Sequence, residues 1–201
     1  MIYRGKIKYI LIILLISILM STLFYLYVNK SYSFFNKTSY SIKNDGEIIK
    51  IHIQQKNKTN FKITANVFED GKFTFTNSWP LDYEVFKVDT GDINNDKSTD
   101  ILVGVIKSTR FDRILRKRLF IFKLFEGYIR PLWLGSRVSQ PLVDFKFCKS
   151  KSEGVVRTIE LERDQLYLVA EYHWIGFGLG FIRYLAREKT LYESYKILNE
   201  N

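Results

Sequence analysis

Apolar and polar residues alternate with a period of two along much of the chain after residue 46. Residues 47–54 read EIIKIHIQ, and isoleucine at every second position predicts a strand with one buried face. Similar runs follow, separated by short turns such as Asp70-Gly71, a strong hairpin signal. The pattern predicts about eleven strands in an all-β domain, joined as an antiparallel meander.

Two stretches repeat a unit of four short strands, at residues 84–134 and 141–187, and residues 47–79 fit a shorter, three-stranded version. A propeller blade has four antiparallel strands in about 50 residues, so the units are blade-like. Three units are fewer than the roughly four blades of a closed propeller. The pattern therefore predicts a propeller-like open stack, or a sandwich or barrel variant. The strands of the longer units are expected near residues 84–89, 100–107, 118–125, 128–134, 141–148, 154–162, 165–174 and 179–187.

The N-terminal part has a different pattern, because residues 10–28 form an apolar run without a charge. As a helix this run would cover roughly 28 Å, close to the hydrocarbon thickness of a bilayer. Basic residues precede it within residues 1–9, whereas Lys30 alone follows closely, so residues 1–9 are expected in the cytoplasm. A cleaved signal peptide is the alternative. The length of the run and the lack of a small-residue cleavage site favour an uncleaved transmembrane signal anchor.

This anchor would make the chain a single-pass protein of the cell membrane, with the bulk of the chain extracytoplasmic. We expect a linker at residues 29–45, a β-domain at residues 46–190 and a C-terminal tail at residues 191–201, either a short helix or a frayed end. The single cysteine, Cys148, excludes an intramolecular disulfide. The exported domain must therefore be held together by its core, helped or not by a metal ion.

Charge narrows the class of partner. Of the 31 Lys and Arg residues, 27 lie beyond residue 30 together with all 21 Asp and Glu residues, which gives the exported part a formal charge of +6. Nucleic acid is scarce outside the membrane and is excluded on that ground. Besides the membrane that the anchor spans, the candidate partners are an envelope polymer, a lipid head group or a protein. A solvated basic surface without a dedicated partner is the alternative interpretation.

Residues 91–105, GDINNDKSTDILVGV, place oxygen-bearing side chains at alternate positions of a loop and then become apolar. Calcium takes about six to eight oxygen ligands, so such a loop suits it. An EF-hand is excluded, because Lys97 and Val103 stand where it requires glycine and glutamate. The pattern predicts one structural calcium ion between two strands, with a hydrated polar turn as the alternative. The candidate ligands are Asp92, Asn94, Asp96, the backbone carbonyl of Ser98, and Asp100.

The same stretch resembles the FG-GAP repeat of integrin alpha-type β-propellers, in which Gly-Asp opens a D-x-N/D-x-D-x-x-x-D loop and an apolar strand ends in Val-Gly. The resemblance covers residues 91–105 and occurs once in the chain. It implies a calcium ion in the first hairpin of a blade, and a role in adhesion, binding or scaffolding. Asn95 and Lys97 stand where the family usually has glycine, which eases turns with positive φ. The matching residues are Gly91, Asp92, Asn94, Asp96, Asp100, Leu102, Val103 and Gly104.

Three further groups of residues are candidates for binding or catalysis. The planar fork of arginine suits phosphate or carboxylate groups, so the basic residues of the connection 109–118 are candidate anion ligands, with a solvated basic loop as the alternative. Alternating acids near a hairpin tip could act as paired carboxylates or simply form a solvated strand face. Aromatic residues near a glycine-rich turn could line a carbohydrate or peptide groove, or belong to the core. These groups are Arg110, Arg113, Arg116, Lys117 and Arg118; Glu160, Glu162 and Asp164; and Tyr172, Trp174 and Phe177.

The sequence contains no G-x-S-x-G, P-loop or H-E-x-x-H motif, and its two histidines, His52 and His173, have no partner at metal-ligand spacing. We therefore expect a non-enzymatic, membrane-anchored binding or scaffold module with a calcium-stabilised hairpin. The alternative is a cell-envelope enzyme that acts on glycan or phospholipid, through the acidic strand face or the arginine-rich loop.

Overall fold

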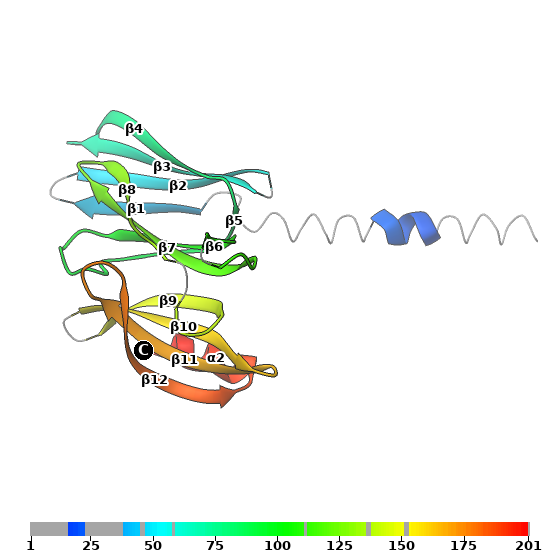
Figure 1. Cartoon of the computed structure of the whole chain (residues 1–201). Coiled ribbons are helices and arrows are strands. Elements are labelled where there is room, and N and C mark those ends of the chain that lie inside the picture. The colour runs from blue at the N-terminus through cyan, green and yellow to red at the C-terminus, as the bar shows by residue number, and fades with distance from the viewer. Residues whose placement is uncertain are drawn as a thin grey trace, which may run out of the picture. The chain divides into compact units, whose positions relative to one another are not determined.

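The computed structural model describes residues 16–22, 38–44, 47–57, 59–110, 112–135, 138–150 and 153–200. The chain divides into two compact units, Met1–Lys37 and Thr38–Asn201. In the first unit, residues 16–22 are helical (Figure 1). No helix among the described residues has both the length and the apolarity needed to cross a membrane. The remainder of the predicted span 10–28, and all of the predicted tip 1–9, lie outside the described residues.

The second unit consists of three antiparallel four-stranded sheets, and each strand pairs with the next one along the chain (Figure 1). The all-β meander is therefore confirmed, and the three sheets do not close into a barrel. The first sheet contains β1 (Thr38–Asn44), β2 (Glu47–Asn57), β3 (Asn60–Glu69) and β4 (Lys72–Leu81). The second contains β5 (Glu84–Gly91), β6 (Asp100–Lys107), β7 (Arg116–Phe125) and β8 (Tyr128–Leu134). The third contains β9 (Leu142–Ser150), β10 (Glu153–Arg163), β11 (Leu166–Trp174) and β12 (Leu179–Lys189).

Strand β1 differs from expectation, because it lies in the stretch 29–45 that the sequence predicts to be a linker. Its segment, TSYSIKN, has only two large apolar side chains and so gives a weak strand pattern. Tertiary pairing supplies what the local pattern lacks: Tyr40 lies opposite Ile51, and Ile42 lies opposite Ile49. Tyr40 also donates a hydrogen bond from its hydroxyl to the carbonyl of Val88 at 3.1 Å, which ties β1 to the second sheet. The first sheet consequently has four strands, and not the three predicted for residues 47–79.

The tight hairpins form where two consecutive residues both accept positive φ. Asp70 and Gly71 have φ of 50° and 76°, and Glu126 and Gly127 have φ of 50° and 74°. Such pairs are typical of type I′ turns, whose twist matches that of the flanking strands. In the hairpin between β10 and β11, the two turn residues are Asp164 and Gln165, with φ of 35° and 64°.

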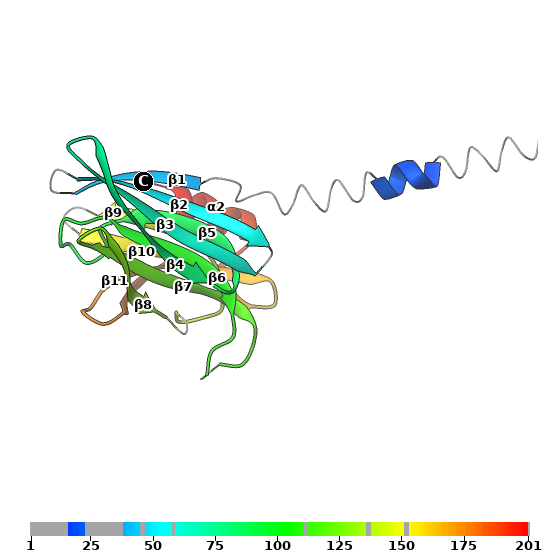
Figure 2. The ribbon, with the colours of Figure 1, turned by 90° about the horizontal axis from the view of Figure 1, so that it is seen from above.

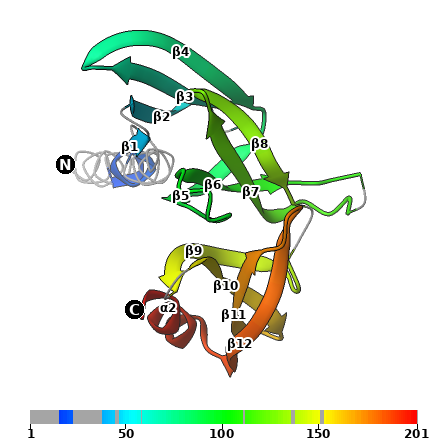
Figure 3. The ribbon, with the colours of Figure 1, turned by 90° about the vertical axis from the view of Figure 1, so that its left-hand side faces the viewer.

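The three sheets stack on one another, and the second sheet lies between the other two (Figure 3). Residues 100–105 of β6 are all buried, as expected for a strand covered on both faces. Trp79 of the first sheet packs near Phe122 of the second, with ring centroids 5.9 Å apart. On the other face of the second sheet, Leu119 and Ile121 share an apolar cluster with side chains of the third sheet, among them Phe145.

The two outer faces of the stack are protected in different ways. The outer face of the first sheet is polar, with Lys50, Lys62 and Thr76 exposed on neighbouring strands. The outer face of the third sheet is covered by helix α2 (Leu191–Asn199), whose Leu198 packs against Ile159 and Val169. The predicted tail is thus a helix for most of its length, and it completes the core of the third sheet.

A capping box explains why α2 begins where it does. The hydroxyl of Thr190 accepts a hydrogen bond from the backbone N–H of Glu193, and the Glu193 carboxylate accepts one from the backbone N–H of Thr190 at 2.9 Å. Two N–H groups that lack partners within the helix are satisfied in this way.

Candidate functional site

The acidic loop, residues 92–99, connects β5 to β6 in the second sheet. Gly91 and Asp100 pair across the base of the loop, so the chain reverses direction between them. Ile93 is fully buried and belongs to the apolar cluster between the second and third sheets. One apolar side chain therefore fixes the loop to the core while its oxygen-bearing neighbours stay nearer the surface.

The side-chain oxygens of the loop are turned toward the loop's own backbone. The Asp92 carboxylate accepts hydrogen bonds from the N–H groups of Asp96 at 3.1 Å and Lys97 at 2.9 Å. The Asn94 side-chain oxygen lies 3.2 Å from the Asp96 nitrogen, and Asp96 accepts from the N–H of Ser98 at 2.8 Å. The structure thus brings Asp92, Asn94 and Asp96 together around one compact turn.

Asp100 differs from the other acids because it is fully buried. Its Oδ2 accepts a hydrogen bond from the N–H of Ile93 at 3.1 Å, whereas its Oδ1 has no hydrogen-bond partner among the described residues. Leaving a buried acceptor unsatisfied costs about 1–3 kcal/mol, and more if the group is charged. The loop therefore contains a buried carboxylate oxygen that a cation or a proton would stabilise.

Electrostatics agree with that geometry. Burial, and after it the negative charges of Asp96 and Asp92, raise the pKa of Asp100 to about 7, although the hydrogen bond from Ile93 acts in the opposite direction. The carboxylates of Asp92 and Asp96 are thus close enough to disfavour the ionisation of Asp100. Among the described residues, no group of three or more His, Cys, Asp or Glu side chains is already arranged to hold a metal ion. The donor set still fits calcium chemistry, because carboxylate, amide and carbonyl oxygens are the ligands that calcium prefers.

Two residues of the loop have the left-handed backbone that glycine usually adopts. Asn95 has φ of 59° and Lys97 has φ of 70°. A non-glycine residue in this region costs on the order of 1–3 kcal/mol and persists only where its surroundings enforce it. The loop therefore keeps a glycine-type turn at both positions, and the Lys97 side chain is exposed.

The loop is also docked onto the third sheet. The side-chain oxygen of Asn95 accepts a hydrogen bond from the N–H of Gly154 in β10 at 3.1 Å. A Cβ atom on Gly154 would lie 2.1 Å from the carbonyl oxygen of Asp92, and one on Gly91 would lie 2.2 Å from the Phe147 ring. The sequence gives no sign of this contact, because 59 residues separate Asn95 from Gly154.

The structure divides the predicted anion ligands into buried and exposed groups. Arg118 is 1% exposed, and its Nε donates to the carbonyl of Lys107 at 2.7 Å. The same guanidinium donates to the carbonyls of Asp112 and Ile114, and it lies 3.1 Å from the Asp112 carboxylate. Arg118 is therefore a structural residue, and we do not retain it as an anion ligand.

Of the other four basic residues, Lys117 is also engaged in the fold. Its Nζ donates to the carbonyl of Val143 at 2.8 Å and lies 4.6 Å from the centre of the Phe86 ring. Arg116 lies 3.9 Å from the Asp112 carboxylate. Arg110 and Arg113 are exposed. Only part of the predicted basic cluster is thus presented to solvent.

The predicted acidic strand face divides in the same manner. Glu160 is fully buried, and it accepts hydrogen bonds from the hydroxyls of Thr158 at 2.6 Å and Tyr172 at 2.8 Å. It also accepts one from the N–H of Gln140 at 2.6 Å, so it holds the connection that leads into the third sheet. Burial raises the pKa of Glu160. Tyr172 is consequently a core residue rather than a groove residue.

Glu162 has a different environment from Glu160. It accepts hydrogen bonds from the Arg187 guanidinium at 2.7 Å and from the backbone N–H of Glu188 at 2.9 Å, both in the edge strand β12. The bond from Glu188 and then those from Arg187 lower the pKa of Glu162. Each of the two glutamates is thus committed to a separate structural contact. Asp164 lies in the turn, Trp174 is half-buried, and Phe177 is 82% exposed.

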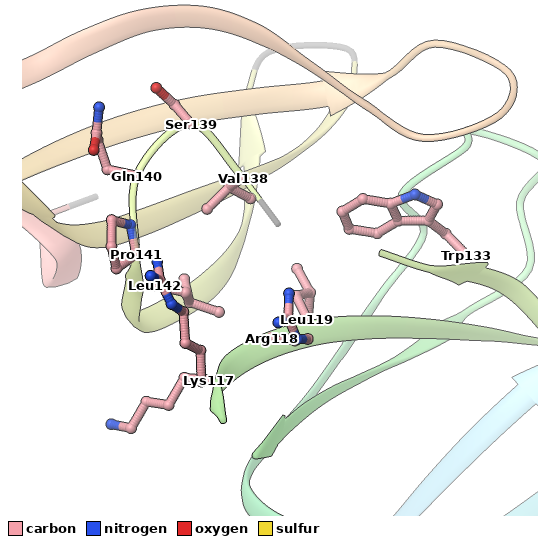
Figure 4. Close-up of a pocket in the computed structure, with 10 residues that line it drawn as sticks. Lys117, Arg118, Leu119, Trp133, Val138, Ser139, Gln140, Pro141 and Leu142 are labelled. Atoms are coloured by element: carbon pink, nitrogen blue, oxygen red, sulfur yellow. The ribbon is translucent and has the colours of Figure 1, made fainter. Parts of the chain in front are cut away.

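A small cavity of about 140 Å³ lies between the second and third sheets (Figure 4). Its lining is mainly apolar, with Leu119, Trp133, Val138 and Pro141 among the contributors. Small-molecule sites usually have volumes of about 300–1,000 Å³. The cavity is therefore too small for an ordinary substrate, and its basic neighbours Lys117 and Arg118 are already bonded to backbone carbonyls.

Comparisons of the chain with protein families, with curated proteins and with solved structures find no match. Among the described residues, the acidic loop remains the strongest candidate site, because it alone combines several oxygen donors with an unsatisfied buried carboxylate.

Proposed function

We propose that the acidic loop binds one structural calcium ion through the side chains of Asp92, Asn94, Asp96 and Asp100 and the backbone carbonyl of Ser98. The observation that carries this proposal is the buried Oδ1 of Asp100, which lacks a hydrogen-bond partner among the described residues. A divalent cation would compensate that oxygen and would also reduce the repulsion among the three carboxylates. The hydrogen bonds that Asp92 and Asp96 now accept would be kept or exchanged as the carboxylates turn to the ion.

The ion would stabilise the junction of two sheets rather than a single hairpin. The loop is fixed by Ile93 in the core and by the bond between Asn95 and Gly154 in β10. A ligand that binds only the folded state stabilises it by mass action, by about 2.7 kcal/mol when its concentration is 100 times its dissociation constant. Calcium would therefore act on the whole body of the protein.

Thermal unfolding of the full chain in detergent, with millimolar calcium or with EGTA, tests the proposal. We expect calcium to raise the melting temperature by several degrees and to have no such effect on the Asp92→Ala/Asp96→Ala variant. Glu69→Ala, which removes an exposed carboxylate from a distant strand, is the control and should respond like the wild type. Equal responses of the wild type and the double variant would show that calcium acts elsewhere.

We further propose that the domain is a binding or scaffold module. Three four-stranded meanders, with the acidic loop in the first hairpin of the second, support a relation to blades of the FG-GAP type. No arrangement among the described residues favours the enzyme alternative, since Glu160 and Glu162 are each bonded to other parts of the fold. The function would then lie in the surface of the domain and not in a catalytic pocket.

The membrane address is also a proposal, and it rests on the apolar run 10–28 and on the basic residues before it. A fusion of alkaline phosphatase to the C-terminus should be active if residues 31–201 are exported. A fusion to residue 9 should be inactive. Activity of both fusions, or of neither, would contradict the proposed orientation.

A further inference from the structure

The connection between β6 and β7 is a second unusual surface of the domain. Its described residues, 108–110 and 112–115, extend away from the stacked sheets (Figures 2 and 3). Its backbone is held from within by Arg118, which donates to carbonyls at both ends and in the middle: those of Lys107, Asp112 and Ile114. Thr109 adds a backbone bond to the carbonyl of Asp112 at 2.8 Å. Hydrogen bonds from Arg118 and Thr109 therefore fix the backbone of this connection at several points.

This scaffold holds two apolar side chains outside the core. Ile114 is 56% exposed and Leu115 is 68% exposed. Surface loops are usually polar, and a long aliphatic side chain gains nothing from a fixed position in water. A buried arginine that fixes the backbone beneath two exposed aliphatic residues points to a partner with an apolar component.

The connection between β6 and β7 is also strongly basic. Residues 108–118 contain five basic residues and one acidic residue. That single acid, Asp112, lies 3.1 Å from the buried Arg118 and 3.9 Å from Arg116, so one negative charge is shared between two arginines and the segment keeps a formal charge of +4. Arg113 is exposed beside the aliphatic pair, and Arg116 follows it directly.

We propose that Ile114 and Leu115, flanked by Arg113 and Arg116, form a contact site for the surface of an anionic lipid bilayer. Aliphatic side chains enter the boundary between head groups and acyl chains, while guanidinium groups stay at the level of the lipid phosphates. Nucleic acid would use the arginines but would gain nothing from exposed isoleucine and leucine. The inference rests on the proposed membrane anchor, which would hold the domain near a bilayer and so permit a weak contact to form.

The test uses the full chain with Cys148→Ser, carrying the environment-sensitive fluorophore NBD on a cysteine that replaces Leu115. The protein is reconstituted into vesicles of phosphatidylcholine, with or without phosphatidylglycerol. We expect a blue-shifted emission and at least a twofold loss of quenching by aqueous iodide only where phosphatidylglycerol is present. Arg113→Glu should abolish this protection, and added salt should weaken it.

A matched control carries the label on a cysteine in place of Phe73, which is 58% exposed in the hairpin between β3 and β4. This label should remain quenched in both kinds of vesicle. Equal quenching at position 115 with and without phosphatidylglycerol would overturn the proposal. Protection that appears with polyglutamate but not with anionic vesicles would also overturn it and would indicate an acidic protein partner.

Membrane association through the proposed anchor is measured separately, by flotation of the same sample with its vesicles. A chain that floats with both kinds of vesicle but shows no lipid-dependent protection contradicts the loop contact alone. A chain that does not float with phosphatidylcholine vesicles contradicts the anchor, whatever the label reports.

Discussion

Gly154 donates its backbone N–H to the side-chain oxygen of Asn95 at 3.1 Å, and this bond joins the acidic loop to the third sheet. The contact is possible because Gly154 has no side chain. A Cβ atom there would lie 2.1 Å from the carbonyl oxygen of Asp92 and 2.8 Å from the Phe147 ring. The loop and the β9–β10 hairpin therefore depend on each other's position.

Gly154→Ala should destabilise the protein by about 1–3 kcal/mol, because the loop and the hairpin must move apart to admit the new methyl group. Urea unfolding measures this change. Glu153→Ala alters the exposed neighbour and should have an effect within about 0.5 kcal/mol. A Gly154→Ala variant as stable as the wild type would mean that the loop is not docked as described.

Asp100→Asn should have opposite effects on the metal-free and the calcium-bound protein. It removes a buried charge while keeping an acceptor for the N–H of Ile93, so the stability measured with EGTA should rise by about 1 kcal/mol. The increase in melting temperature on adding calcium should be lost. Asp164→Asn, in an exposed turn, serves as the control and should change neither quantity. A variant that is destabilised with EGTA and still responds to calcium would contradict the role assigned to Asp100.

Glu171 should make stability depend on pH. The carboxylate is 3% exposed and lies 2.9 Å from Arg157 and 2.8 Å from Arg183. Burial opposes its ionisation, but the hydrogen bonds from Arg157 and Arg183 prevail and lower its pKa below the ordinary 4.5. A group whose pKa is lower in the folded state than in the unfolded state stabilises the fold. The full stabilisation is present at pH values above the unfolded-state pKa, and it is lost as the pH falls through the folded-state pKa.

Glu171→Gln should therefore cost about 1–3 kcal/mol at neutral pH, because it removes the carboxylate that pairs with the half-buried Arg157 at 2.9 Å. The difference from the wild type should shrink as the pH is lowered through 4.5 and below. Chemical unfolding across that range measures it. A difference that stays constant down to acid pH would show that the loss came from packing and not from charge.

Leu198→Ala should destabilise the protein by about 2–5 kcal/mol, since Leu198 is 1% exposed and packs against Ile159 and Val169. Leu191→Ala, in the same helix, is the matched control because Leu191 is 38% exposed, and it should have a smaller effect. Thermal unfolding compares the two. Similar losses for both variants would indicate that helix propensity, rather than burial against the third sheet, decides the outcome.

The sequence predicts much of this fold, because strand periodicity and turn chemistry are local. The pair Asp70-Gly71 forms the hairpin that its residue types predict. Strand β1 was missed, since its position depends on pairing with β2 and on the contact between Tyr40 and the second sheet. The calcium ion and the membrane span remain predictions.

The burial of Arg118 and Glu160 was also missed, although the alternation contained a signal for both. Arg118 shares its parity in β7 with Phe120 and Phe122, and both faces of that strand are covered. Glu160 shares its parity in β10 with Thr158 and Val156, on a buried face. Charge alone suggested exposure for both residues. Their hydrogen-bond partners, such as Lys107 and Gln140, lie far enough along the chain that only the folded structure reveals them.

Helix α2 occupies the face of the third sheet on which a further sheet would otherwise stack. A protein made of repeated sheets can gain length by duplicating a unit, provided that the last unit presents a face on which the next can stack. Here α2 covers that face at the C-terminal end, and the exposed lysines on the outer face of the first sheet disfavour addition at the other. A fourth unit would have to displace the helix and leave Leu198 without its site. Helix α2 thus caps the third sheet, in the way that a capping element covers the last unit of a repeat array.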